Sequence, residues 1–93
     1  MRLSAIQKDV LFVLFAIRTK GKAGPVPSMT LLGMINRGRS AEVFPSNFRT
    51  SCHTLVDNGL LGKYRDEQLN LGFSLTEAGA ELGGQIYQAR MEG

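Results

Sequence analysis

Residues Ser46 to Thr76 read SNFRTSCHTLVDNGLLGKYRDEQLNLGFSLT, a stretch whose hydrophobic period changes halfway along. Its first half repeats apolar residues every three or four positions, which predicts a helix over residues 46–58 with one buried stripe. The run Asp57-Asn58-Gly59 ends this helix, because Asn and Gly tolerate the left-handed backbone of a helix C-cap. The predicted buried stripe consists of Phe48, Cys52 and Leu55.

The second half predicts a β-hairpin over residues 60–75. Its first strand runs from Leu60 to Tyr64 or Arg65, and Asp66 to Gln68 form the turn. In the second strand, from Leu69 to Leu75, apolar residues alternate with polar or small ones, which is the period-2 pattern of a half-buried strand. A helix with a polar outer face followed by a basic hairpin suits duplex DNA, since the helix fits the major groove and the hairpin can reach the flanking backbone.

Both ends of the chain are also predicted to be helical. Ser4 and Gln7 form a capping box at the start of the first helix, which then becomes apolar nearly all round. Such a helix is either the centre of the domain or meets a second subunit with its spare face. Thr76 caps a last helix to about Met91, whose glycines indicate close approach of another backbone, from the first helix or from a partner's last helix. These glycines are Gly79, Gly83 and Gly84.

The segment between the first helix and residue 46 predicts a second, short helix. Ser28 is expected to cap this helix, which runs from Met29 to about Asn36. The connection from Arg37 to Pro45 is longer than a tight helix–helix turn, and residues 40–44 are expected to add a helical turn. Any third strand is expected to come from the proline-containing linker Gly21 to Ser28.

This order of elements resembles the winged helix-turn-helix family. The resemblance rests on the helix exit Leu55-Val56-Asp57-Asn58-Gly59-Leu60-Leu61 and on Phe73-Ser74-Leu75-Thr76-Glu77-Ala78-Gly79, which looks like the strand-to-helix junction of MarR-like and PadR-like bacterial regulators. It covers about Leu3 to Arg90. It implies a mainly α fold with a small antiparallel β-hairpin (α+β), in one domain over residues 1–93. The hairpin over residues 60–75 is then the wing.

Size and charge limit the possible functions. The 93 residues carry a net charge of +3 and a pI near 9.4, a mild basic bias that is compatible with a nucleic-acid partner. One cysteine and one histidine allow neither an intrachain disulfide nor a usual zinc site, so we expect no metal and no cofactor. The apolar run Val10 to Ile17 is too short to span a membrane and lacks a small-residue cleavage site, which favours a cytoplasmic protein.

The leading hypothesis is a sequence-specific double-stranded DNA-binding regulator of a prokaryote, plasmid or phage. Helix 46–58 would lie in the major groove and the wing on the backbone. Asn and Arg can bind adenine and guanine edges through two hydrogen bonds, while Ser, Thr and basic side chains suit phosphates. We also expect a homodimer through the first and last helices, because operators typically have two-fold symmetry. The candidate DNA-binding residues are Arg37, Arg39, Ser46, Asn47, Arg49, Thr50, His53, Thr54, Lys63 and Arg65.

A rival hypothesis from another class is a winged-helix module for protein assembly. The acidic pair Asp66 and Glu67 at the wing tip, where a phosphate-binding wing usually carries Lys or Arg, favours it, as does the very apolar first helix. An enzyme is not expected. His53 has only Asp57 near it at i+4, which is a typical surface pair, and the chain has neither a glycine-rich phosphate loop nor a nucleophile elbow.

Overall fold

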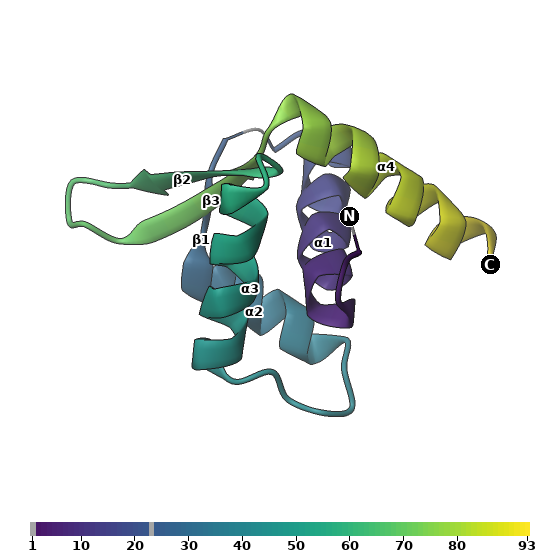
Figure 1. Ribbon diagram of the computed structural model, residues 1–93, viewed down its shortest axis with the longest axis horizontal. Helices are drawn as coiled ribbons and strands as arrows, with labels where there is room; N and C mark the ends of the chain where they lie inside the picture. Colours follow the sequence, from purple (N-terminus) through teal and green to yellow (C-terminus); the bar gives the residue numbers. More distant parts are fainter. Residues whose placement is uncertain (1, 23) are drawn as a thin grey trace.

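The computed structural model describes residues 2–22 and 24–93. These residues form four helices and a small antiparallel sheet, and Figure 1 shows the hairpin of β2 and β3 projecting to one side while α4 extends to the other. This order confirms the expected mainly α fold with a small antiparallel hairpin. The elements are α1 (Ala5–Thr19), β1 (Val26–Pro27), α2 (Ser28–Arg37), α3 (Pro45–Asp57), β2 (Leu61–Arg65), β3 (Leu71–Leu75) and α4 (Glu77–Glu92).

The core is built around α1. This helix begins with the expected capping box, in which Ser4 Oγ accepts from the Gln7 N–H at 3.2 Å and Gln7 Oε1 accepts from the Ser4 N–H at 2.8 Å. Buried residues of α2, α3 and the sheet pack around three buried side chains of α1, namely Val10, Leu11 and Leu14. The stripe predicted for α3 is confirmed, because none of its three members is more than 2% exposed: Phe48, Cys52 and Leu55.

The sheet has the strand order β1-β3-β2, and both pairings are antiparallel. β1 comes from the linker before α2 and pairs Val26 with Phe73, so the third strand predicted from that linker is confirmed. In the wing, Lys63 lies opposite Phe73, and Arg65 lies opposite Leu71. Residues directly opposite each other in a sheet point to the same face, so both wing cations share the face of the buried Phe73.

α4 covers the apolar face of α1 that the rest of the core leaves open. Gly83 lies so close to α1 that a Cβ atom there would be 3.0 Å from the Leu11 carbonyl oxygen. The Tyr87 ring stacks on Phe12 with a centroid distance of 5.6 Å and lies 5.4 Å from the Phe15 ring. Gly83 and Gly84 therefore serve the packing of α4 on α1 within one chain, and α1 is the central helix of the fold.

The segment between β1 and α3 differs from the prediction in two ways. Ser28 is the first residue of α2 and makes no side-chain cap, because Pro27 occupies the N-cap position. Residues 40–44 are not helical. Instead, the Asn36 side chain accepts from the Val43 N–H at 2.8 Å and donates to the Val43 carbonyl at 3.2 Å. This pair of hydrogen bonds holds Val43 in the core and fixes the connection without a helical turn.

The second strand of the wing starts later than predicted. Leu69 has a φ of 65° and lies in the turn, so the strand begins at Leu71. The Asp66 carboxylate accepts hydrogen bonds from the backbone N–H groups of Gln68 and Asn70, both at 2.8 Å. An aspartate that caps its own turn in this way extends the turn to residues 66–70 instead of 66–68.

Candidate nucleic-acid interface

The outward face of α3 carries most of the residues expected to contact DNA. Because the opposite face is buried in the core, these side chains are exposed, except that His53 is only partly so. The Thr50 and Thr54 hydroxyls donate to the carbonyls of the preceding turn, at 3.1 and 3.0 Å. Each hydroxyl must therefore release its helix carbonyl before it can donate to a phosphate. The α3 face consists of Ser46, Asn47, Arg49, Thr50, His53 and Thr54.

A groove runs between α3, the wing and the start of α2. It has a volume of about 520 Å³, and Arg49 and His53 line it from α3, while Arg65 and Asp66 line it from the wing. Ser28 and Met29, at the start of α2, line its other side. The fold thus brings two arginines and the chain's one histidine, from segments far apart in the sequence, to one concave surface. We call this surface the α3–wing groove.

Of the two wing cations, Arg65 lines this groove, and Lys63 lies on the same face of the sheet. Lys63 and Arg65 are exposed and lie two residues apart in β2, on the sheet face that also carries the buried Phe73. Tyr64 lies on the opposite face, where its ring covers Gly62. Both basic side chains of the wing are consequently on the α3 side of the sheet, which is the side that a duplex held by α3 would meet.

The wing tip is held by its own hydrogen bonds. The Asp66 carboxylate accepts hydrogen bonds from the backbone N–H groups of Asn70 and Gln68 and from the Asn70 side chain. These hydrogen bonds, that from the Asn70 backbone most of all, lower the pKa of the Asp66 carboxyl below its ordinary value. One guanidinium nitrogen of Arg65 donates to the Leu69 carbonyl at 2.9 Å. Asp66 therefore stays ionised and organises the tip, and Arg65 keeps its remaining N–H groups for a ligand.

Two of the predicted site residues lie elsewhere. Arg39 forms an ion pair with Asp9 of α1, and Asp9 also accepts from Arg90 of α4 at 2.9 Å. Arg37 is exposed at the C-terminal end of α2, about 14 Å along the helix from Ser28 at the rise of an α-helix. The structure therefore does not bring Arg37 and Arg39 to the α3–wing groove.

Ser28 and Met29 also line the groove, although neither is among the DNA-binding residues predicted from the sequence. Met29 is 68% exposed, which is unusual for a large apolar side chain. The sequence does mark Met29 as a candidate, because it lies outside the apolar stripe of α2 formed by Leu31, Leu32 and Ile35. A hydrophobic residue outside the buried stripe is free to contact a ligand.

Other kinds of site find little support in the part of the chain that the structure describes. Over residues 2–22 and 24–93, no three His, Cys, Asp or Glu side chains are grouped so that they could hold a metal ion. None of the helices in these ranges is long and apolar enough to cross a membrane. Burial raises the pKa of the Cys52 thiol to about 12, which keeps it protonated and unreactive at neutral pH.

No family model and no curated protein sequence matches this chain. Several solved structures share its architecture. H. salinarum RosR has a TM-score of 0.78 at 19% identity, over 97% of this chain and 76% of that one. A MarR-family transcriptional regulator from Silicibacter pomeroyi has a TM-score of 0.74 at 23% identity, over 97% of this chain and 53% of its own. The fold is a MarR-like winged helix.

The winged-helix assignment confirms the resemblance found in the sequence and extends to other regulators. MepR, a transcription regulator of the Staphylococcus aureus multidrug efflux pump MepA, has a TM-score of 0.71 at 17% identity. The match covers 97% of this chain and 59% of MepR, so the chain spans little more than half of MepR and of the S. pomeroyi regulator. In winged-helix terms, α2 and α3 are the helix-turn-helix pair and the β2–β3 hairpin is the wing.

Proposed function

We propose that this chain binds double-stranded DNA as a transcription regulator, with α3 in the major groove and the wing along the flanking backbone. The observation that carries the proposal is the α3–wing groove, where Arg49 and His53 meet Arg65 and the start of α2. A major groove about 12 Å wide accepts one α-helix. With α3 in it, the cationic face of the wing lies beside the phosphates of the adjacent strand.

The residues of this surface divide by chemistry. Asn47 and Arg49 are the candidates for base contacts, since amide and guanidinium groups form paired hydrogen bonds with adenine and guanine edges. Lys63 and Arg65 supply attraction to phosphates of any sequence. The remaining α3 residues (Ser46, Thr50, His53 and Thr54) complete the contact. Arg37 and Arg39 are left out, because they lie away from the groove and Arg39 is paired with Asp9.

The structural neighbours support a regulatory role for the fold. MepR and the S. pomeroyi protein are both transcription regulators. By analogy with them, the present chain would act without catalytic chemistry in the cytoplasm of a prokaryote, on a chromosomal, plasmid or phage operator.

A second copy is part of the proposal, through the outer faces of α1 and α4. A surface groove of about 560 Å³ there is lined by Phe15, Gly84, Tyr87 and Met91, and Met91 is 65% exposed. Gly83 is not available for this contact, since α1 of the same chain lies against it. Sedimentation velocity tests the dimer. A single species at monomer mass, well above the concentrations used for DNA binding, would remove it from the proposal.

The experiment that tests DNA binding is selection from a pool of random duplexes, followed by gel-shift titration. We expect one family of related sequences to be enriched and bound on the order of a thousand-fold more tightly than a scrambled duplex. Asn47→Ala should relax the preference at one base position while leaving binding to the scrambled duplex nearly unchanged. Enrichment of no sequence family would contradict the proposal.

The second candidate function is a winged-helix module for protein assembly. The specific observation in its favour is the wing tip, where Asp66 and Glu67 replace the cations of a phosphate-binding wing. The two functions differ in the charge they need on the wing face that carries Lys63 and Arg65. Replacing Lys63 with Glu should abolish binding to every duplex if the groove binds DNA, because it places an anion beside the phosphates. Unchanged duplex affinity in that variant would favour the assembly module.

A further inference from the structure

The wing tip holds an exposed leucine in a strained backbone conformation. Leu69 is 70% exposed, and among the described residues it is the only non-glycine residue with a positive φ. A left-handed backbone is unfavourable for a bulky side chain, and an exposed leucine gains nothing from folding to compensate for it. The proposed DNA contact explains neither feature.

The rest of the tip keeps Leu69 in this position. Its carbonyl accepts from Arg65 and its N–H donates to the Asp66 carbonyl, each at 2.9 Å. Leu69 is therefore a preorganised apolar knob, with the carboxylates of Asp66 and Glu67 in the same turn. Carboxylates favour a cationic partner, so the tip suits an apolar pocket with a cationic rim.

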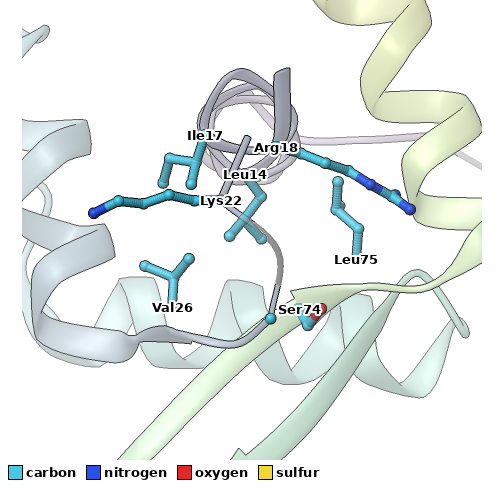
Figure 2. A pocket seen from close by; sticks show the side chains of 8 residues that line it. Leu14, Ile17, Arg18, Lys22, Val26, Ser74 and Leu75 are labelled. Carbon is cyan, nitrogen blue, oxygen red and sulfur yellow. The ribbon is translucent and has the colours of Figure 1, made fainter. Parts of the chain in front are cut away.

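The chain itself carries such a pocket. It lies between the end of α1, the linker and the base of the sheet, and Figure 2 shows Arg18 and Lys22 extending to opposite sides of it. Its volume of about 90 Å³ is far below the roughly 300 Å³ of the smallest usual ligand pockets, so it suits one aliphatic side chain better than an effector molecule. Its lining combines the apolar side chains of Leu14, Ile17, Val26 and Leu75 with the polar or charged residues Arg18, Lys22 and Ser74 and with Gly24.

A chain cannot fill this pocket with its own wing tip. Leu69 and Leu75 are separated by six residues of largely extended chain, which span about 20 Å at the rise of a β-strand. We propose that Leu69 of one copy inserts into the Arg18–Lys22 pocket of a second copy. The carboxylates of the tip then face the two cations, so that an apolar contact at the centre is surrounded by opposite charges at the rim.

The knob and the pocket are different surfaces, so the contact is head-to-tail and leaves one free knob and one free pocket in each pair of chains. One leucine in a shallow pocket is a weak contact between free molecules. Copies on neighbouring sites of one duplex meet at an effective concentration in the millimolar range, where a weak contact is populated. The contact therefore makes DNA binding cooperative, and this consequence rests on the proposed function.

Disulfide cross-linking tests the contact without DNA. Leu69→Cys and Ser74→Cys variants are mixed at high protein concentration with glutathione disulfide, and the native Cys52 is buried and stays unreactive. We expect a cross-linked dimer at about tenfold the yield of a control mixture, because docking raises the local concentration of the two thiols. The control replaces Ser74→Cys with Ser40→Cys, at an exposed position of the α2–α3 connection. Equal yields would overturn the proposal.

Titration of a duplex with one or two adjacent selected sites tests the consequence. We expect the second copy to bind the two-site duplex about tenfold more tightly than the first. Leu69→Asn should remove this gain and leave single-site affinity unchanged, since asparagine tolerates the left-handed backbone. Lys22→Glu should also remove it, and adding Glu67→Lys should restore it. Full cooperativity in the Leu69→Asn variant would overturn the proposed contact between copies. If no duplex site is selected at all, DNA binding is overturned instead, and the cross-linking experiment alone decides whether the contact exists.

Discussion

The backbone carbonyl of Leu60 occupies the space that a Cβ atom at Gly79 would need. Thr76 closes the same junction, because its hydroxyl donates to the Gly59 carbonyl at 2.7 Å and accepts from the Gly79 N–H at 3.0 Å. The start of α4 is thereby fixed against the connection between α3 and β2. This junction sets the direction in which α4 leaves the sheet and crosses α1.

Gly79→Ala should lower the free energy of unfolding by about 1–3 kcal/mol, the usual cost of forcing extra atoms into a packed site. Because alanine is the better helix former, helix propensity alone would make Gly79→Ala stabilising, so a loss of stability indicates the packing clash. Gly33→Ala is the matched control, since nothing lies within 4 Å of a Cβ at that helical position, and it should raise stability by about 0.5–1 kcal/mol. Urea unfolding measures both variants, and a Gly79→Ala protein as stable as the wild type would contradict the close approach.

Cys52 should resist thiol reagents for as long as the chain is folded. Burial raises its pKa to about 12, so almost none of the nucleophilic thiolate is present at pH 8. We expect labelling in native buffer to be at least on the order of a hundred-fold slower than in denaturant, where the thiol returns to its ordinary pKa. A fast reaction under native conditions would show that α3 is not packed on the core as described.

The wing tip should loosen at low pH. The hydrogen bonds of the tip lower the pKa of the Asp66 carboxyl in the folded protein. Ionised Asp66 therefore stabilises the folded tip fully above the pKa of about 4 that it has in the unfolded chain, and this stabilisation is lost as the pH falls through the lower pKa of the folded state. Backbone amide shifts of Gln68 and Asn70 should titrate together in this acid range. Asp66→Asn should speed amide exchange at the tip without changing global unfolding, and tip amides that do not respond to pH would contradict this role for Asp66.

Much of the fold could be predicted from local sequence patterns. The apolar stripe of α3, the capping box at Ser4 and the two strands of the wing follow from short-range periodicity, and the structure confirms them. The features that the sequence did not predict depend on contacts between distant residues or on turn chemistry. Asn36 replaces a helical turn by bonding to Val43, seven residues later, and no periodic pattern predicts that.

Local sequence patterns also predict part of the candidate site. The face of α3 follows from helical periodicity, so its exposed residues were found. Arg39 could not be placed, because its ion pair with Asp9 joins residues thirty positions apart. Met29 was overlooked because only the folded chain brings the start of α2 beside Arg49. Charge alone could not separate Arg37, at the far end of α2, from the arginines of the groove.

Arg49 is the central DNA contact of the proposed function, and the most direct test compares Arg49→Ala with Arg37→Ala on a selected duplex. Both variants remove one exposed arginine and lower the net charge equally, but only Arg49 lines the α3–wing groove. We predict that Arg49→Ala weakens specific binding by about 1–3 kcal/mol and Arg37→Ala by less than about 0.5 kcal/mol, measured by fluorescence anisotropy at one fixed salt concentration. Equal losses in the two variants, or none in either, would contradict the assignment of the groove as the DNA-binding surface.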